Sequence, residues 1–220
     1  MTSILLNGPS GRLEGHYTHN TKAQSPTALI LHAHPGHGGN MNNPLSLKLH
    51  KLFSDLEFST LRFNFRGVGK SDGEHDGSEG ELADSAIALD WLQNQNQDSQ
   101  AYWIWGISFG AWVGMQLLMR RPEILKFILV SPPVGKYDFN FLAPCPASGV
   151  VINADKDPLI EVSLIKDKLF ISNTLGYDSS FVESAAFAYI SIRTLKKLPS
   201  AFPKTTGCIK ENVCGNIYIP

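Results

Sequence analysis

A short segment near the middle of the chain constrains the fold more than any other. Residues 102–105 are an apolar run typical of a buried strand, and residues 109–119 have the spacing of an amphipathic helix. Between them stands Gly106-Ile107-Ser108-Phe109-Gly110. Glycine is required where backbones approach closely or adopt strained angles. The segment therefore predicts a sharp strand–turn–helix unit with Ser108 at its apex.

The rest of the chain alternates between short apolar runs and helical patterns. The runs predict strands at residues 27–31, 59–66, 127–130 and 149–152, and the helical patterns cover residues 45–56 and 81–92. Turn signals in the first 20 residues predict an antiparallel hairpin at one edge. Alternation of this kind favours an α/β fold with a mostly parallel sheet covered by helices on both faces. Active loops then lie at the carboxyl ends of the strands.

The length of the chain, 220 residues, suits one sizeable core. We expect a single domain over residues 1–197, with a clear pattern only over about 5–160, and an irregular C-terminal tail over 198–220. Weaker signals beyond residue 160 indicate a strand at 168–172 and a helix at 180–195.

Composition narrows the classes of partner. The chain has 19 basic and 20 acidic residues and a net charge of −1, which favours neither nucleic acid nor an acidic membrane surface. Neither a leader peptide nor a spanning apolar segment is recognisable, so we expect a cytoplasmic protein. Three cysteines without metal-site spacing favour reduced thiols. We expect a small-molecule partner and no cofactor, and the sequence leaves the oligomeric state open.

A second Gly-x-Ser-x-Gly occurs at Gly69-Lys70-Ser71-Asp72-Gly73. It follows a strand but continues into a polar loop, whereas Ser108 has a strand directly before it and a helix directly after it. Context therefore selects Ser108, because the five-residue string alone is common by chance.

Several motifs, in order and with compatible spacing, resemble those of one family. They occupy residues 7–15, 29–43, 61–74, 105–112 and 132–139. Together they are similar to small, lidless bacterial α/β-hydrolases related to the dienelactone hydrolases. The resemblance implies an α/β-hydrolase fold that hydrolyses a small ester, lactone or other acyl compound through an acyl-serine.

The resemblance also assigns roles to individual residues. Ser108 would be the nucleophile, Gly106 and Gly110 would shape its turn, and the backbone N–H groups of Phe109 and of a residue near Gly36 would form the oxyanion hole. A further position, Asp157, matches the catalytic acid. Beside it Asp155 would shape the loop, Asp138 is a weaker alternative acid, and Arg66 would be structural.

A catalytic histidine should follow the acid, yet the last histidine in the chain is His75. The segment most similar to the histidine loop of this family is Gly176-Tyr177-Asp178-Ser179, in which Ser179 occupies the position of the histidine. Three interpretations stay open: a degenerate hydrolase that only binds its ligand, a tail replaced through a frameshift or gene error, or an upstream base such as His34 or His37.

A metal-dependent hydrolase is the remaining alternative. His32, His34 and His37 follow an apolar strand with spacing similar to the metal loop of metallo-β-lactamase-like hydrolases. Such a loop has aspartate where Gly36 stands, and its enzymes need further histidines later in the chain. We therefore expect these histidines to be loop and core residues rather than metal ligands.

Overall fold

The computed structural model describes residues 1–142 and 145–152. Their helices and strands alternate along the chain as the apolar periodicity predicts. In chain order these are β1 (Thr2–Gly8), β2 (Gly11–Thr18), β3 (Thr27–Leu31), η1 (Pro35–His37), α1 (Pro44–Asp55), β4 (Ser59–Phe63), α2 (Glu79–Gln95), β5 (Tyr102–Ile107), α3 (Phe109–Arg120), β6 (Ile124–Val130), η2 (Asn140–Leu142) and β7 (Ser148–Ile152).

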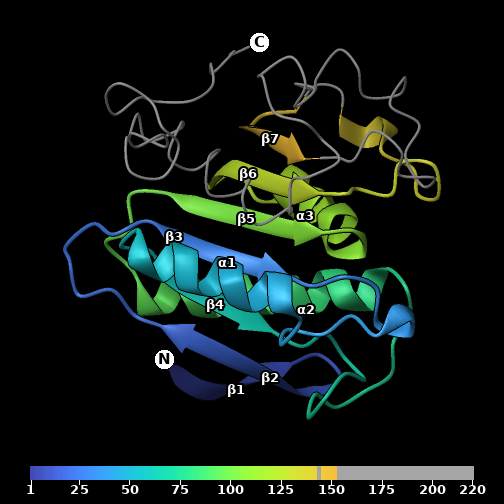
Figure 1. Ribbon diagram of the computed structural model, residues 1–220, viewed down its shortest axis with the longest axis horizontal. Helices are drawn as coiled ribbons and strands as arrows, with labels where there is room; N and C mark the ends of the chain where they lie inside the picture. Colours follow the sequence, from blue (N-terminus) through green and yellow to red (C-terminus); the bar gives the residue numbers. More distant parts are fainter. Residues whose placement is uncertain (143–144, 153–220) are drawn as a thin grey trace, which may run out of the picture.

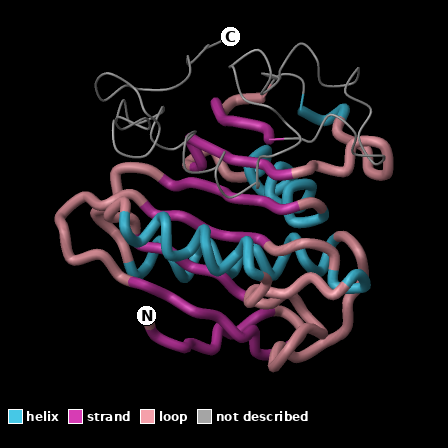
Figure 2. Tube along the Cα trace, in the orientation of Figure 1, coloured by secondary structure: helices cyan, strands magenta, loops and turns pink. Residues whose placement is uncertain are grey.

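The described strands form one sheet in the order β1-β2-β4-β3-β5-β6-β7. Strands β4, β3, β5, β6 and β7 run parallel, while β1 pairs antiparallel with β2 and β2 antiparallel with β4. Helix α1 lies on one face of the sheet, and α2 and α3 lie on the other (Figure 1). The tube view shows the same three layers (Figure 2). The predicted α/β-hydrolase architecture with its antiparallel N-terminal hairpin is confirmed.

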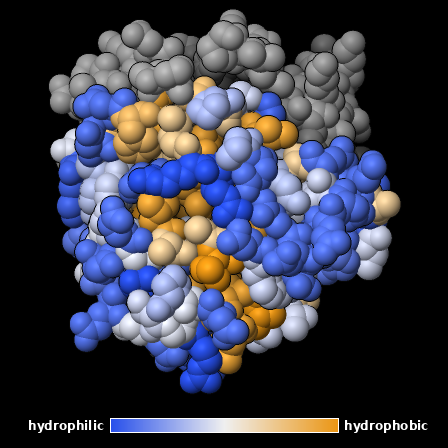
Figure 3. Space-filling model, turned by 180° about the vertical axis from the view of Figure 1, so that it is seen from behind, coloured by the Kyte–Doolittle hydropathy of each residue, from blue (hydrophilic) through white to orange (hydrophobic). Residues whose placement is uncertain are grey.

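Two clusters of buried side chains, one on each face, hold the layers together. Residues from α1, including Leu49 and Phe53, pack against Trp103 and Trp105 of β5. On the other face Leu89 of α2 and residues of α3 pack against Ile104, also of β5. Successive side chains of a strand point to opposite faces, so β5 serves both cores. From the side of α2 and α3, apolar residues show between polar ones (Figure 3).

Helix α1 shows how local sequence sets an element's start. Asn43 caps it, because its side-chain oxygen accepts a hydrogen bond from the Leu45 N–H at 3.1 Å. Pro44 occupies the first helical position, where a missing N–H does no harm. These residues determine the point at which the chain leaves the loop after β3.

The predicted end of the strand at Arg66 is wrong, because β4 ends at Phe63. The Asn64 N–H still donates to the Glu14 carbonyl of β2 at 2.8 Å, but the next two backbone donors turn to side chains. The Phe65 N–H donates to His32 Nε2 at 3.1 Å, and the Arg66 N–H donates to the Asp84 carboxylate at 3.1 Å. The chain therefore leaves the sheet early and forms the irregular loop 64–78.

Other sequence expectations fall elsewhere in the chain. The strand at 168–172, the helix at 180–195 and the tail at 198–220 lie outside the described residues. Within the described part, no helix combines the length and apolar character needed to cross a bilayer.

Candidate functional site

The turn between β5 and α3 holds Ser108 in a strained backbone conformation. Its φ of 50° and ψ of −116° lie in a region that side-chain-bearing residues rarely adopt. The Ser108 N–H donates to the Val130 carbonyl at 2.8 Å, which ties the turn to the end of β6. The residue is half-buried, and no described residue makes a hydrogen bond to its Oγ. The hydroxyl therefore has no structural use within the described part of the chain.

Both glycines of this turn are required by close backbone approach. A Cβ on Gly106 would lie 2.3 Å from the Ala111 Cα. One on Gly110 would lie 2.4 Å from the Leu31 carbonyl oxygen and 2.5 Å from that of His32. Only glycine leaves enough room at either position. The second contact also presses the first turn of α3 against the end of β3, from which the loop carrying His34 begins.

Backbone donors lie beside Ser108. Phe109 is the first residue of α3, and the first N–H groups of a helix have no helical acceptor. Its amide and the positive end of the helix dipole are therefore available to a developing negative charge. The Gly36 N–H, the second predicted donor, instead donates to His34 Nδ1 at 3.0 Å. It would have to leave this partner to bind a substrate oxygen.

Two imidazoles pack against the buried Phe109 ring, and a third packs against one of them. His34 lies 5.1 Å from that ring and His75 lies 5.5 Å from it, measured between centroids. His34 and His75 are 4.7 Å apart, and His37 is 5.0 Å from His34. The strand order explains this meeting, because β4 and β5 flank β3 and the loops at their carboxyl ends converge.

His75 is held by a buried acid. Its Nδ1 lies 2.6 Å from Glu81 Oε1, and the Glu81 side chain has no exposed surface. The Asp76 N–H donates to the same oxygen at 3.2 Å, while no described residue binds Oε2. Burial raises the pKa of Glu81 and the Asp76 side chain raises it further, whereas the His75 hydrogen bond lowers it. Sequence reasoning missed this pair, because a loop histidine and a helical glutamate share no periodic pattern.

His34 has a different role in the cluster. Its Nδ1 accepts the Gly36 N–H, so the neutral ring carries its proton on Nε2. Burial lowers the pKa of His34, and the nearby His75 and Lys136 lower it further. The ring is therefore neutral at pH 7 and presents a donor.

His32 is occupied on both ring nitrogens. Its Nδ1 contacts the Ala33 carbonyl at 2.6 Å, and its Nε2 accepts the Phe65 N–H at 3.1 Å. It is therefore a core residue and is not free to join His34 and His37 as a metal ligand. In the part of the chain that the structure describes, no group of three His, Cys, Asp or Glu is placed to hold a metal ion.

A buried ion pair fixes the position of the loop 64–78, which carries His75. Arg66 donates to Asp84 from Nε at 3.0 Å and from Nη2 at 2.8 Å, and it also contacts Asp76 at 3.4 Å. The arginine thus ties the loop to α2, as its expected structural role requires.

The structure does not test the predicted catalytic acid and gives no support to its alternative. Asp157 and Asp155 lie outside the described residues. Asp138 is exposed, and its carboxylate accepts the Asn140 N–H at 2.8 Å within its own turn. The acid therefore stays a prediction.

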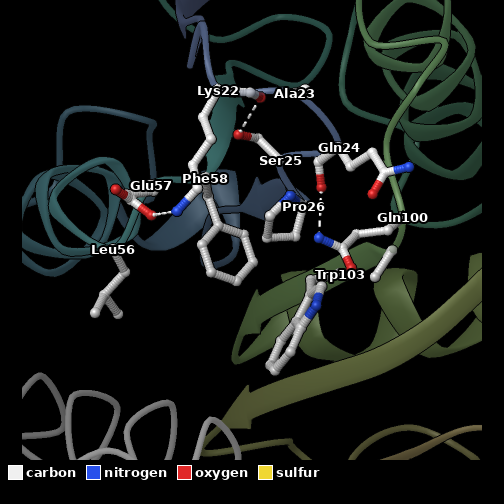
Figure 4. A pocket seen from close by; sticks show the side chains of 11 residues that line it. Lys22, Ala23, Gln24, Ser25, Pro26, Leu56, Glu57, Phe58, Gln100 and Trp103 are labelled. Carbon is white, nitrogen blue, oxygen red and sulfur yellow. Dashed lines mark hydrogen bonds and ion pairs between the residues drawn. The ribbon is translucent and has the colours of Figure 1, made fainter.

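A pocket of about 280 Å³ lies at the amino ends of the parallel strands, opposite the ends where Ser108 lies (Figure 4). It is lined by residues that precede the strands, among them Pro26 before β3, Phe58 before β4 and Ala101 before β5. These are the amino ends of parallel strands, whereas Ser108 follows a carboxyl end. The pocket therefore does not belong to the Ser108 site.

Comparison with known families agrees with this geometry. Residues 27–149, which hold the Ser108 turn and most of the sheet, match the model of the alpha/beta hydrolase fold family. The chain belongs to the α/β-hydrolase family. An uncharacterised protein of Rickettsia prowazekii is 49% identical to this chain over 186 residues, which cover 83% of this chain and 77% of that protein.

Solved structures give the same result. A putative alpha/beta hydrolase from Agrobacterium tumefaciens is 51% identical, with a TM-score of 0.74 over 76% of this chain and 78% of that one. A serine hydrolase without a lid from Xanthomonas campestris is 29% identical, with a TM-score of 0.67 over 76% of each chain. The lysophosphatidylserine lipase ABHD12 of Xenopus tropicalis is 26% identical, and this α/β-hydrolase chain covers 51% of its length.

The end of the chain matches a different family. Residues 156–220 match the model of anhydro-N-acetylmuramic acid kinase. A kinase of this name from Methylorubrum populi is 39% identical over 54 residues, which are 14% of its length. The comparison of Ser179 with the hydrolase histidine is therefore not supported. The match supports the expectation of a C-terminus that diverges from the hydrolase family.

Proposed function

We propose that the chain hydrolyses a small ester, lactone or related acyl compound through an acyl-serine on Ser108. The observation that carries the proposal is the backbone of Ser108, with its positive φ and the two close-approach glycines beside it. Backbone strain is frequent at active sites, and here it occurs together with two close-approach glycines and a hydroxyl that no described residue uses.

In this mechanism Ser108 Oγ attacks the acyl carbon. The carbonyl oxygen becomes negatively charged beside the Phe109 N–H and the amino end of α3. Loss of the alcohol leaves an acyl-serine, which water then hydrolyses to the acid. Each step needs a base that takes and returns one proton.

A fluorophosphonate probe, which reacts only with activated serines, tests the proposal. We expect the wild-type chain to be labelled and Ser108→Ala to lose labelling. Ser131→Ala is the matched control, because Ser131 also has a positive φ, of 47°, at the end of the neighbouring strand β6. It should label as the wild type does. Equal labelling of wild type and Ser108→Ala would contradict an activated nucleophile.

A non-catalytic binding protein of the same fold is the second candidate. It is favoured by the lack of any histidine after His75 and by the kinase-like match at residues 156–220. A triad that lacks one member still retains about 10³- to 10⁴-fold catalysis over water. Absence of any Ser108-dependent labelling or ester hydrolysis would therefore favour binding alone.

A further inference from the structure

An acyl-serine mechanism leaves open which group is the base. This inference rests on the proposed function and concerns the seven histidines of the chain, of which His75 is the last. An imidazole is the usual base for a serine nucleophile. If one acts here, it comes from the part of the chain up to His75.

Four of the seven histidines are committed elsewhere. His16 contacts Ser3 Oγ, His19 contacts the Tyr17 hydroxyl, and His50 Nε2 lies 2.8 Å from Thr18 Oγ1. These contacts involve β1, β2 and α1, and β2 is separated from β5 by β4 and β3. The fourth, His32, is buried with both nitrogens engaged.

His34, His37 and His75 remain. His34 and His75 pack against the Phe109 ring, and His37 packs against His34. The base needs an imidazole with a proton on one nitrogen and a lone pair on the other, aimed at the hydroxyl. In neutral His34 the nitrogen away from the backbone carries the proton, so this ring donates rather than accepts. His37 is exposed, and none of the described carboxylates contacts it. Neither has the carboxylate that would orient a base.

His75 does have such a carboxylate. Glu81 Oε1 lies 2.6 Å from its Nδ1. An ionised carboxylate can only accept, so beside it Nδ1 carries the proton and the Nε2 lone pair is left, with no hydrogen bond from any described residue. The glutamate is fully buried on the first turn of α2, so the ring is anchored to a rigid element. The imidazole also packs against the ring of Phe109, the residue that follows Ser108.

We propose that His75, oriented by Glu81, is the general base for Ser108, acting directly or through one bound water. The Ser108 Oγ–H proton passes to Nε2 while Oγ bonds to the acyl carbon. The imidazolium returns that proton to the departing alkoxide as the ester C–O bond breaks. In the second half a water gives its proton to the same nitrogen, and Ser108 recovers it when the acid leaves.

Hydrolysis of p-nitrophenyl acetate and fluorophosphonate labelling by the full chain test this assignment. We expect His75→Ala to lose about 10²- to 10⁴-fold in the Ser108-dependent rate. Added imidazole should restore part of the rate in His75→Ala but not in Ser108→Ala. Glu81→Gln should lower the rate less and shift its pH profile, because it changes the hydrogen bond that orients the ring. His19→Ala, at an exposed histidine that follows β2 and contacts the Tyr17 hydroxyl, is the matched control and should keep the wild-type rate.

The outcomes separate this inference from the proposed function. A Ser108-dependent rate that survives His75→Ala overturns the base assignment and leaves the acyl-serine mechanism standing. A rate that falls in His75→Ala without rescue by imidazole also overturns it, since a purely structural role predicts that result. Absence of any Ser108-dependent rate in the wild type overturns both. Circular dichroism and urea unfolding of each variant show whether the fold is retained.

Discussion

At the scale of single residues, the Gly-x-Ser-x-Gly pattern occurs twice, and its two serines have different surroundings. Ser71 is buried, its Oγ donates to the Asn64 carbonyl at 2.8 Å, and it accepts the Glu14 N–H at 2.9 Å. Its hydroxyl therefore holds β2 and the loop after β4 together. The Ser108 hydroxyl has no such partner among the described residues. What distinguishes the two serines is the use of their hydroxyl groups.

His32 makes the stability of the fold depend on pH. Burial lowers its pKa from 6.5 to about 4. The unfolded chain therefore binds a proton between pH 6.5 and 4 that the folded chain does not, so stability is full above pH 6.5 and falls as the pH is lowered. The shift corresponds to about 3 kcal/mol.

The variant His32→Gln removes this titration. We expect the wild type to lose about 2–3 kcal/mol more unfolding free energy than His32→Gln between pH 7.5 and 4.5. Urea unfolding at several pH values measures this difference. Parallel curves for the wild type and His32→Gln would contradict the burial effect.

At the scale of elements, side chains rather than apolar periodicity determine where α2 begins. The apolar pattern predicts a start at Glu81, but the helix starts at Glu79. The Asp76 carboxylate accepts the N–H groups of Ser78 at 3.0 Å and Gly80 at 3.1 Å, and so caps the first turn. A capping group outside the helix is invisible to a periodicity count, which explains the error.

The Arg66–Asp84 pair holds the loop after β4 to α2. Asp84 has no exposed surface and Arg66 has little, at 0% and 9% of their side chains. We expect Asp84→Ala to cost about 3–5 kcal/mol, because it removes the buried partner of the guanidinium and leaves only the half-exposed Asp76 at 3.4 Å. Urea unfolding is the measurement.

The exposed pair Lys51–Asp55 of α1 provides the control. Its side chains are 76% and 59% exposed, and such pairs contribute about 0.3–0.5 kcal/mol. Asp55→Ala should therefore change stability very little. Similar losses of unfolding free energy in Asp84→Ala and Asp55→Ala would contradict the prediction that the buried pair contributes more to stability than the exposed one.

At the scale of the whole molecule, the sheet separates two cores that share strand β5. Phe53 of α1 and Leu89 of α2 are both fully buried, one on each face. Truncation to alanine should cost about 3–5 kcal/mol for Phe53 and about 2–5 kcal/mol for Leu89.

Because the two side chains lie in separate clusters, the costs should add. We expect the double variant Phe53→Ala/Leu89→Ala to equal the sum of the single variants within about 0.5 kcal/mol. A double-mutant cycle in urea measures the coupling. Since domain stabilities are about 5–15 kcal/mol, all four proteins are measured in a stabilising osmolyte, so that the double variant still folds. A coupling well above 1 kcal/mol would mean that the cores do not act separately.

Much of the fold was predictable because its signals are local. The apolar run of β3 was predicted at both ends, and the strand–turn–helix around Ser108 was predicted from its glycines and flanking periodicity. The end of β4 was not predictable, because the N–H groups of Phe65 and Arg66 donate to side chains that lie far away in the sequence.

The sequence by itself determined the position of Ser108, the need for Gly106 and Gly110, and the lack of a histidine after His75. These follow from short-range sterics and from residue counts. Only the tertiary structure decided which side chains meet around Phe109, and it placed His75 on Glu81 beside His34. The physical reason is the strand order β4-β3-β5, which brings separate loops to one edge of the sheet and which no local spacing encodes.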